Sequence, residues 1–427
     1  MIEFLLIILQ IVFIILFFNF SIYEIYNTIN IKYFDLFESM SVNILFLLNI
    51  FLSLSILNLK INFIFWPVFI LTCFGILKNF ENKKIILKNN VNFIIIFIII
   101  SFVISIDLAT SIDLGWDVKF FGFLKTLNYY QNNNLENLNN LIINDYPHLG
   151  NLVWSIFWKF PLNYSEYFGR ISFIVIYITS IFAFYGNLKI NKASKLIFIF
   201  LTISITYEYS LMSGLQEILV FSLILIASKF AYYLILEKNN LNKGKLLIFI
   251  ILCTNAVCWI KNEGLILMLI LNFSLLFTKI DLNLKKKLVL GTFFIVLLRI
   301  LYFVYFKINL DSSDFENTLA SSNFSFIKII NDIKLISFYI AVYLTEIPIF
   351  LITLPLILWI SLTKNNNKML NRFILIFLSL NILFIFVSFA FNETNVEWQV
   401  RVALKRIIFE SAGFYLLPIL QIINKKI

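Results

Sequence analysis

Apolar runs of roughly 17 to 25 residues recur from one end of the 427-residue chain to the other, each long enough to cross the ~30 Å hydrocarbon core of a bilayer as a helix. Only 14% of the residues are charged, against about 25% in soluble domains, and the mean hydropathy is +0.92. The runs therefore predict an all-α polytopic membrane protein. An outer-membrane barrel is excluded because its strands would alternate apolar and polar residues.

We expect about thirteen transmembrane helices in one transmembrane domain covering residues 1–427, with no soluble domain and no internal repeat. Ile347–Pro348 and Pro355 should kink one long span. The predicted spans are 2–22, 40–58, 62–78, 91–108, 168–186, 196–212, 217–236, 246–260, 264–279, 288–306, 335–361, 373–391 and 407–423.

Lysine and arginine gather in short segments between alternate spans, which the positive-inside rule places in the cytoplasm. These segments account for the net charge of +10, so we expect no nucleic-acid partner. The long segment 108–167 is then an external loop. The acidic and cationic side chains discussed in the next paragraphs would all lie on the extracytoplasmic face. The orientation of the first three spans stays open, because Lys32 and Lys60 give little bias. The basic residues are Lys78, Lys83, Lys84, Lys88, Lys189, Lys192, Lys195, Lys238, Lys243, Lys245, Lys279, Lys285, Lys286, Lys287, Lys364, Lys368, Arg372, Lys425 and Lys426.

The external loop opens with "SIDLGWDVKFFGFLKTLNYY", residues 111–130. If this stretch is helical from Asp113, then Asp113 and Asp117 share one face and the helix lies in the membrane interface. Capping of that helix is the alternative role for Asp113, and Asp107 could simply mark the end of a span. An apolar stripe on the same helix would consist of Trp116, Phe120, Leu124 and Leu127.

Further along the loop, Pro147 and Gly150 bracket a turn in "DYPHLGNLVWSIFWKFP". The aromatic segment "LVWSIFW" is too short to span a bilayer and predicts a second interfacial helix. His148 and Asp145 are candidates for substrate binding. A turn at the membrane surface is the competing explanation for this composition.

Two clusters of charge complete the external face. Lys261 and Glu263 lie in a tight turn between two spans, where charged groups are costly and tend to be paired or functional. Arg401, Lys405 and Arg406 open the last span, and their cationic groups would suit a phosphate. A hairpin ion pair explains the first cluster equally well, and snorkelling toward water explains the second.

Cofactor chemistry finds little support in the sequence. Cys73, Cys253 and Cys258 lie inside apolar spans without a CxxC pair, and His148 is the only histidine. We expect no metal site and no cofactor, although the acidic cluster leaves a divalent cation possible. Glu208 and Glu217 flank a short external turn and could contact a cation or sugar hydroxyls. No P-loop, GxSxG, HExxH or Rossmann pattern occurs.

The order and common sidedness of these motifs resemble the integral-membrane glycosyltransferases of the GT-C fold, including the aminoarabinose and protein O-mannosyl transferase relatives. The resembling segments are Asp113 with Trp116–Asp117, "YPHLGNLVW" (146–154), "KNEG" (261–264) and "RVALKRIIFESAGFYLLPIL" (401–420), about a fifth of the chain. Here about four spans precede the acidic loop, whereas the family usually places it after the first. The adjacent Asp-Glu pair of many relatives is absent.

The resemblance implies transfer of a sugar from a polyprenyl-phosphate carrier to a glycan, lipid or protein acceptor. It places the protein among the lipids of a bacterial inner membrane, with the active site on the extracytoplasmic side. It implies an acidic base in the first long loop: Asp117 first, Asp113 second, with Asp107 also open. A carboxylate positioned as general base raises the rate of such a reaction by about 10²–10⁴-fold. Cations are needed to stabilise the negative charge that develops on the leaving phosphate. The candidates are Lys261, Arg401 and Arg406.

Other functions remain open. A secondary transporter or lipid flippase is the main alternative, but transporters place ionisable groups near the midplane on interrupted helices. A polysaccharide polymerase or ligase would carry its large external loop late in the chain, whereas the longest loop here is early. A non-catalytic scaffold is the last alternative.

Overall fold

The computed structural model describes residues 2–21, 31, 33–111, 113–132, 134, 145–160, 165–188, 190–207, 209–308, 326–362, 368–390 and 396–425. Within these ranges every regular element is a helix and no strand occurs. The hydrocarbon core of a bilayer contains no water that could bond to backbone N–H and C=O groups. A continuous apolar run therefore forms a helix there, because a helix pairs these groups with one another. The all-α architecture predicted from the sequence is confirmed for the described residues, and its long apolar helices are compatible with a polytopic membrane protein.

Nine helical segments among the described residues are long and apolar enough to cross a membrane. They are α1 (Ile2–Phe20), α3 (Leu36–Ile56), two parts of α4 (Ile61–Thr110), α7 (Tyr167–Phe184), α10 (Glu217–Leu236), α11 (Asn240–Cys258), α13 (Leu282–Tyr305) and α17 (Lys368–Ala390).

Two bent pairs raise the number of candidate spans to 11. One is α15 (Phe326–Glu346) with α16 (Pro348–Leu362), bent by 101°. The other joins α18 (Val396–Gln399), the π-helical turn η4 (Val400–Leu404) and α19 (Lys405–Ser411) to η5 (Phe414–Leu416) and α20 (Leu417–Lys425), with a bend of 47°. The remaining helices are α5 (Phe123–Asn132), α6 (Leu149–Lys159), α8 (Lys192–Thr206), α9 (Tyr209–Met212), α12 (Asn262–Leu276) and the π-helical turn η1 (Val118–Gly122).

Every predicted span overlaps a described helix, but the count of about thirteen stays a prediction. The predicted single span 335–361 is instead two helices that meet at Ile347. Pro348 begins α16, where its missing N–H costs nothing, and it cannot continue the hydrogen bonding of α15. Pro355 lies inside α16 without ending it.

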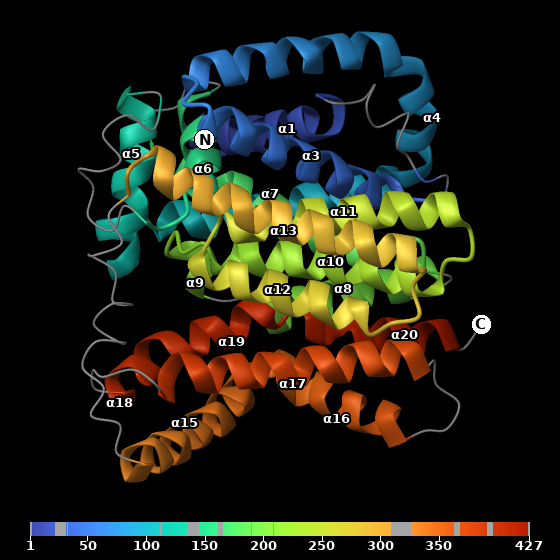
Figure 1. Cartoon of the computed structure of the whole chain (residues 1–427). Helices are drawn as coiled ribbons and strands as arrows, with labels where there is room; N and C mark the ends of the chain where they lie inside the picture. The colour runs from blue at the N-terminus through green and yellow to red at the C-terminus, as the bar shows by residue number, and fades with distance from the viewer. Residues whose placement is uncertain are drawn as a thin grey trace.

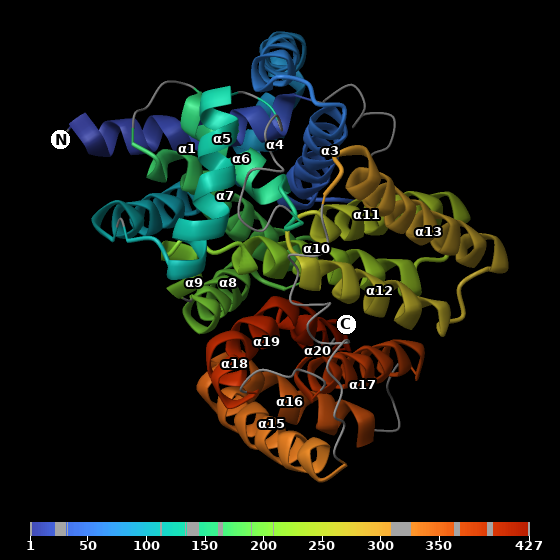
Figure 2. The same cartoon turned by 60° about the vertical axis from the view of Figure 1, so that its left-hand side comes forward.

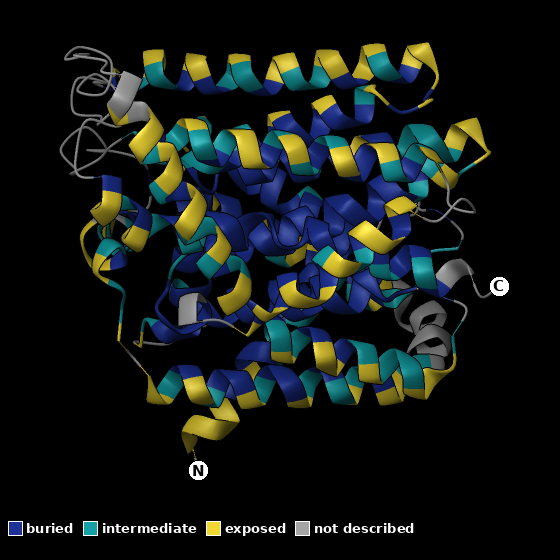
Figure 3. Ribbon diagram, turned by 90° about the horizontal axis from the view of Figure 1, so that it is seen from below, coloured by how far each residue is buried: buried dark blue, intermediate teal, exposed yellow. Residues whose placement is uncertain are grey.

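The core lies around α7, whose 18 residues are all buried, and α10 packs beside it. The outer helices α1 and α13 keep exposed apolar faces, so Figure 3 shows a buried centre surrounded by partly exposed ribbons. In Figures 1 and 2 the C-terminal helices α15 to α20 form a group beside the rest. The two parts meet where α19 packs on α10 and α17 packs on α12.

Basic residues lie at one end of the central helices. Lys238 follows α10, Lys243 is in the first turn of α11, and Lys279 follows α12. The opposite ends of these helices carry Glu217, which begins α10, and Lys261, which precedes α12. The unusual polar residues are therefore separated from the basic segments by the length of a helix.

The 108–167 segment, predicted as an external loop, differs from the two interfacial helices expected. Residues 113–115 are not helical, and helix begins at Trp116, continuing through η1 into α5. Asp113 and Asp117 therefore do not share a helix face, and that prediction was wrong. The predicted helix at "LVWSIFW" is α6, but its residues from Leu149 to Trp158 are buried against α5 and α7 instead of lying at a surface. Residues 135–144 and 161–164 of the loop lie outside the described ranges.

Candidate functional site

A cavity of about 240 Å³ lies where the 108–167 segment, the start of α10, the start of α12 and α19 come together. Segments far apart in the sequence supply its walls, and Ala403 and Ile407 of the last bent pair close one side. Six charged residues line it: Asp117, Lys125, Glu217, Lys261, Glu263 and Arg406.

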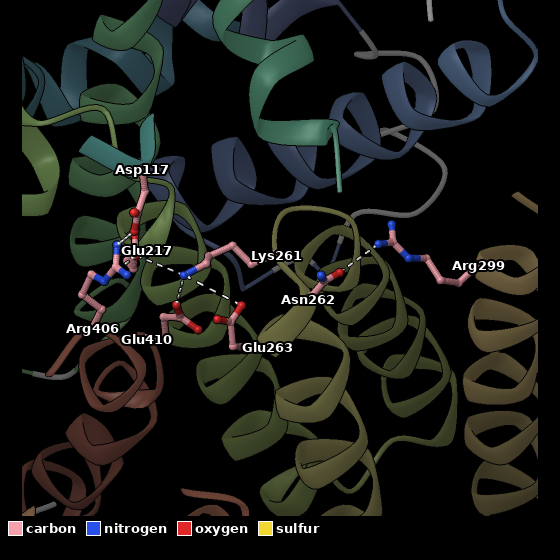
Figure 4. Close-up of polar contacts among 8 residues, drawn as sticks. All are labelled: Asp117, Glu217, Lys261, Asn262, Glu263, Arg299, Arg406 and Glu410. Atoms are coloured by element: carbon pink, nitrogen blue, oxygen red, sulfur yellow. Dashed lines mark hydrogen bonds and ion pairs between the residues drawn. The ribbon is translucent and has the colours of Figure 1, made fainter. Parts of the chain in front are cut away.

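Lys261 is the buried centre of this charge cluster (Figure 4). Its Nζ lies 2.6 Å from Glu410 Oε1, 3.0 Å from Glu217 Oε1 and 3.8 Å from Glu263 Oε2. Burial alone would lower the pKa of Lys261, but these carboxylates outweigh it and hold the pKa well above its usual value. Lys261 therefore stays protonated at neutral pH and binds α10, α12 and α19 together.

Glycine fixes the position of Lys261. Gly264 lies in the first turn of α12, and a Cβ there would overlap the carbonyl oxygen of Val257 on α11. Only glycine therefore allows the two helices to approach so closely directly after the turn. The tight turn expected from "KNEG" is present, and it directs the Lys261 side chain into the bundle instead of toward water.

Glu217 and Glu410 are the two most buried acids of the cluster. Glu217 begins α10 and is 1% exposed, a position where the helix dipole favours negative charge. Its Oε1 accepts from Lys261 and lies 3.8 Å from Nε of Arg406. Glu410 on α19 is fully buried, and its Oε1 accepts from Lys261.

Arg406 joins the last bent pair to the 108–167 segment. Its Nη1 donates to Oδ2 of Asp117, a residue 289 positions earlier in the chain (Figure 4). The side chains are only partly buried, with 28% of Arg406 and 33% of Asp117 exposed. This ion pair therefore lies where a ligand could reach it, in contrast to the buried contacts of Lys261.

Lys125 on α5 is a second buried lysine of the cavity. Its Nζ donates to the carbonyl oxygen of Tyr146 at 2.6 Å. Burial lowers the pKa of Lys125 to about 7, because the charged ammonium loses hydration. The charge of the cavity therefore changes near neutral pH.

Arg299 on α13 supports the site from behind. Its Nη2 donates to the carbonyl oxygen of Asp145 at 2.9 Å and to Oδ1 of Asn262 at 3.0 Å (Figure 4). The guanidinium also lies 4.9 Å from the centre of the Trp259 ring. It thereby fastens the loop before α6 to the start of α12, and both segments contribute cavity residues.

His148 is buried beside this support and does not line the cavity. Its Nε2 lies 2.9 Å from Ser55 Oγ, and its ring stacks on Tyr302. Burial, with Arg299 and Lys125 nearby, lowers the pKa of His148 well below its usual value, so the imidazole is neutral. These contacts indicate packing of the loop instead of the predicted contact with substrate.

The cavity collects five of the residues singled out from the sequence: Asp117, Glu217, Lys261, Glu263 and Arg406. Three others lie elsewhere on the molecule, in addition to His148. The Asp113 side chain is 79% exposed and pairs with Lys119 at 3.1 Å. Asp107 accepts from the Tyr207 hydroxyl, and Arg401 donates to Tyr339 and Glu397.

Several residues of the cavity lining and of the charge cluster around Lys261 were missed by the sequence reasoning. Glu410 was not singled out, although an acid within an apolar run one helical turn after Arg406 is a signal of buried pairing. Lys125, Tyr146, Asn151 and Gln216 carried no comparable signal, because polar residues are ordinary in a loop. Glu208, the other acid noted beside Glu217, lies outside the described residues.

Metal ligation finds no support in the described part of the chain. No group of three or more histidine, cysteine, aspartate or glutamate side chains is placed there to hold an ion. The cavity acids face cations instead, since Lys261 contacts three carboxylates and Arg406 contacts Asp117.

No family model matches the chain, and no similar curated protein or solved structure is found. The likeness to GT-C enzymes therefore depends on the sequence motifs alone.

Proposed function

We propose that this chain is a glycosyltransferase that moves a sugar from a polyprenyl-phosphate carrier to an acceptor on the extracytoplasmic face of a bacterial inner membrane. The observation that carries this proposal is the cavity, which joins a carboxylate and a guanidinium at the end of the bundle opposite the basic segments. By the positive-inside rule that end is extracytoplasmic.

Asp117 is the proposed general base. It is the one candidate among Asp107, Asp113 and Asp117 that lines the cavity, and a third of its side chain is exposed. The acceptor hydroxyl oxygen attacks the anomeric carbon of the sugar. The bond from that carbon to the carrier phosphate breaks with its electron pair on the phosphate, and the hydroxyl proton passes to Asp117.

Arg406 is the proposed contact for the carrier phosphate. Its guanidinium is partly exposed and can donate two parallel hydrogen bonds to phosphate oxygens. A bound phosphate competes with Asp117 for that guanidinium, so donor binding releases the carboxylate to accept a proton. Lys261 is held by three carboxylates and is proposed to position Glu217 and Glu410 instead of binding phosphate directly.

The polyprenyl chain is proposed to lie in the membrane outside the cavity. A cavity of about 240 Å³ admits a polar headgroup but no long isoprenoid. Trp116 and Phe120 stand beside Asp117, are 67% and 44% exposed, and have ring centres 5.0 Å apart. We propose that these rings contact the first isoprene units.

A transfer assay in membranes tests the proposal. Membranes containing the wild-type chain are supplied with radiolabelled polyprenyl-phosphate sugars, and the label in acceptors is measured. Asp117→Asn should abolish transfer, while the matched variant Asp113→Asn, which removes an exposed acid outside the cavity, should retain it. Equal transfer by wild type and Asp117→Asn would exclude Asp117 as the base.

A secondary transporter or lipid flippase is the second candidate, because two candidate spans are broken. The second break, between Ser411 and Phe414, comes directly after Glu410 of the charge cluster. Discontinuous helices with ionisable groups at the break are typical of transporters. Movement of an intact sugar-carrier lipid across a vesicle membrane, without cleavage, would favour this function.

A further inference from the structure

Four buried oxygen atoms at the cavity lack a hydrogen-bond donor among the described residues: Gln216 Oε1, Glu217 Oε2, Glu263 Oε2 and Glu410 Oε2. Gln216, Glu217 and Glu263 line the cavity. Glu410 does not line it but contacts Nζ of the lining residue Lys261. Buried polar atoms in native proteins almost always have partners, so such a group of exceptions requires an explanation. We call Gln216, Glu217 and Glu263 the acceptor wall.

The geometry holds these oxygen atoms in place. Gln216 Nε2 donates to Oδ1 of Asn151, which fixes the amide and leaves its oxygen without a donor. A Cβ at residue 150 would overlap the Gln216 amide, so Gly150 makes room for it. Glu217 is fixed through its other oxygen, Oε1, which accepts from Lys261 at 3.0 Å.

The three oxygen atoms of the acceptor wall are acceptors, and this decides which ligand chemistry fits. The Nζ of Lys261 already contacts three carboxylates, and Arg406 contacts Asp117 and Glu217. A ligand group facing the acceptor wall must therefore supply donors, as hydroxyl and amino groups do. A carboxylate or second phosphate facing the acceptor wall would meet like charge, and Lys125, the other cation of the cavity lining, already donates to the carbonyl oxygen of Tyr146.

We propose that the acceptor wall binds the transferred sugar through its hydroxyl or amino groups, and that sugars carrying a carboxylate are rejected. This inference rests on the proposed function, because it assumes that the carrier phosphate lies at Arg406 and the sugar beyond it. The acceptor wall then determines specificity: it selects a sugar headgroup without acidic substituents.

Matched sugar pairs test the inference. The purified full chain in nanodiscs binds radiolabelled short-chain polyprenyl phosphate, which is displaced by polyprenyl-phosphate glucose or glucuronate and by polyprenyl-phosphate galactose or galacturonate. Each pair differs only at C6, where a hydroxymethyl group becomes a carboxylate. We expect at least one neutral sugar to compete about ten-fold or more better than its acidic partner, since sites built to bond a hydroxyl discriminate strongly.

Two variants and a control assign the effect to the acceptor wall. Gln216→Met and Glu217→Gln should each reduce the preference for the neutral sugar. If Glu217→Gln does not fold, as judged by its thermal unfolding, Gln216→Met decides alone. Gln421→Met is the matched control, because Gln421 on α20 also donates to an asparagine and has a buried Oε1 without a donor, but lies outside the cavity.

The outcomes separate the two proposals. Equal or tighter binding of the acidic sugars in both pairs would overturn the inference while leaving the carrier site intact. An undiminished preference in Gln216→Met would also overturn it. If the wild-type chain does not bind polyprenyl phosphate at all, the proposed function itself fails and the inference fails with it.

Discussion

Replacing Asp117 with asparagine separates the two roles proposed for its carboxylate. As a base it is needed for turnover, so Asp117→Asn should lower the rate of transfer by roughly 10²–10⁴-fold. As the partner of Arg406 it competes with the carrier phosphate, so the same variant should bind polyprenyl phosphate more tightly. A variant that binds its donor better and turns it over worse is the expected combination.

The size of the binding effect follows from the exposure of the ion pair. With 28% and 33% of the two side chains exposed, solvent screens the contact, and such pairs contribute up to about 1 kcal/mol. Removing a competing interaction of that strength lowers the dissociation constant for polyprenyl phosphate roughly five-fold. A change of ten-fold or more would need a far more buried pair than the one observed.

Binding of radiolabelled polyprenyl phosphate to the chain in nanodiscs measures this change. Asp113→Asn is the control, since its carboxylate is 79% exposed and pairs with Lys119 outside the cavity. Unchanged or weaker binding by Asp117→Asn would refute the competition for Arg406. Retained turnover would refute the role of Asp117 as the base.

Three further predictions follow from the described contacts. Lys261→Met leaves Glu217 and Glu410 buried without their cation, so the free energy of unfolding should fall by about 3–5 kcal/mol, and a thermal midpoint equal to that of wild type would show that the cluster is not structural. The pKa of Lys125 falls from 10.5 to about 7 on folding, so its charge destabilises the folded chain fully below pH 7, and that cost disappears as the pH rises toward 10.5. The thermal midpoint of wild type relative to Lys125→Met should therefore rise over this pH window, and a difference independent of pH would contradict the assignment. Finally, Asp113→Cys should react with an impermeant thiol reagent from outside intact cells and Asn240→Cys only after permeabilisation; the reverse pattern would place the cavity in the cytoplasm.

The fold could be predicted from the sequence wherever one long-range pattern decides it. Apolar length and alternating basic segments gave the helical membrane class and placed α10, α11 and α12 within a few residues of their observed bounds. The sequence predicted only a kink near Ile347, whereas α15 and α16 are two separate helices with a 101° bend between them. Pro348 signals that the helix is interrupted, but the angle between α15 and α16 depends on how they pack against the rest of the protein.

The site was harder to predict because it depends on pairing between distant residues. Asp117 and Arg406 are 289 residues apart, and nothing local in either segment indicates the ion pair. A helix assumed from Asp113 suggested a pair of acids on one face, whereas residues 113–115 are not helical and separate Asp113 from the helix that carries Asp117. Glu410 was hidden for the opposite reason: it lies in an apolar run, and its partner Lys261 lies on another helix.

The proposed glycosyltransferase breaks the bond between a sugar and its carrier phosphate, whereas a transporter leaves that bond intact. The most direct measurement uses purified protein in sealed vesicles that contain a doubly labelled polyprenyl-phosphate sugar and an acceptor fraction. For the proposed function, we predict that the sugar label moves to acceptor while polyprenyl phosphate accumulates, and that Asp117→Asn prevents both changes. Intact donor that crosses the vesicle membrane, with the two labels still joined, would contradict it and identify a transporter.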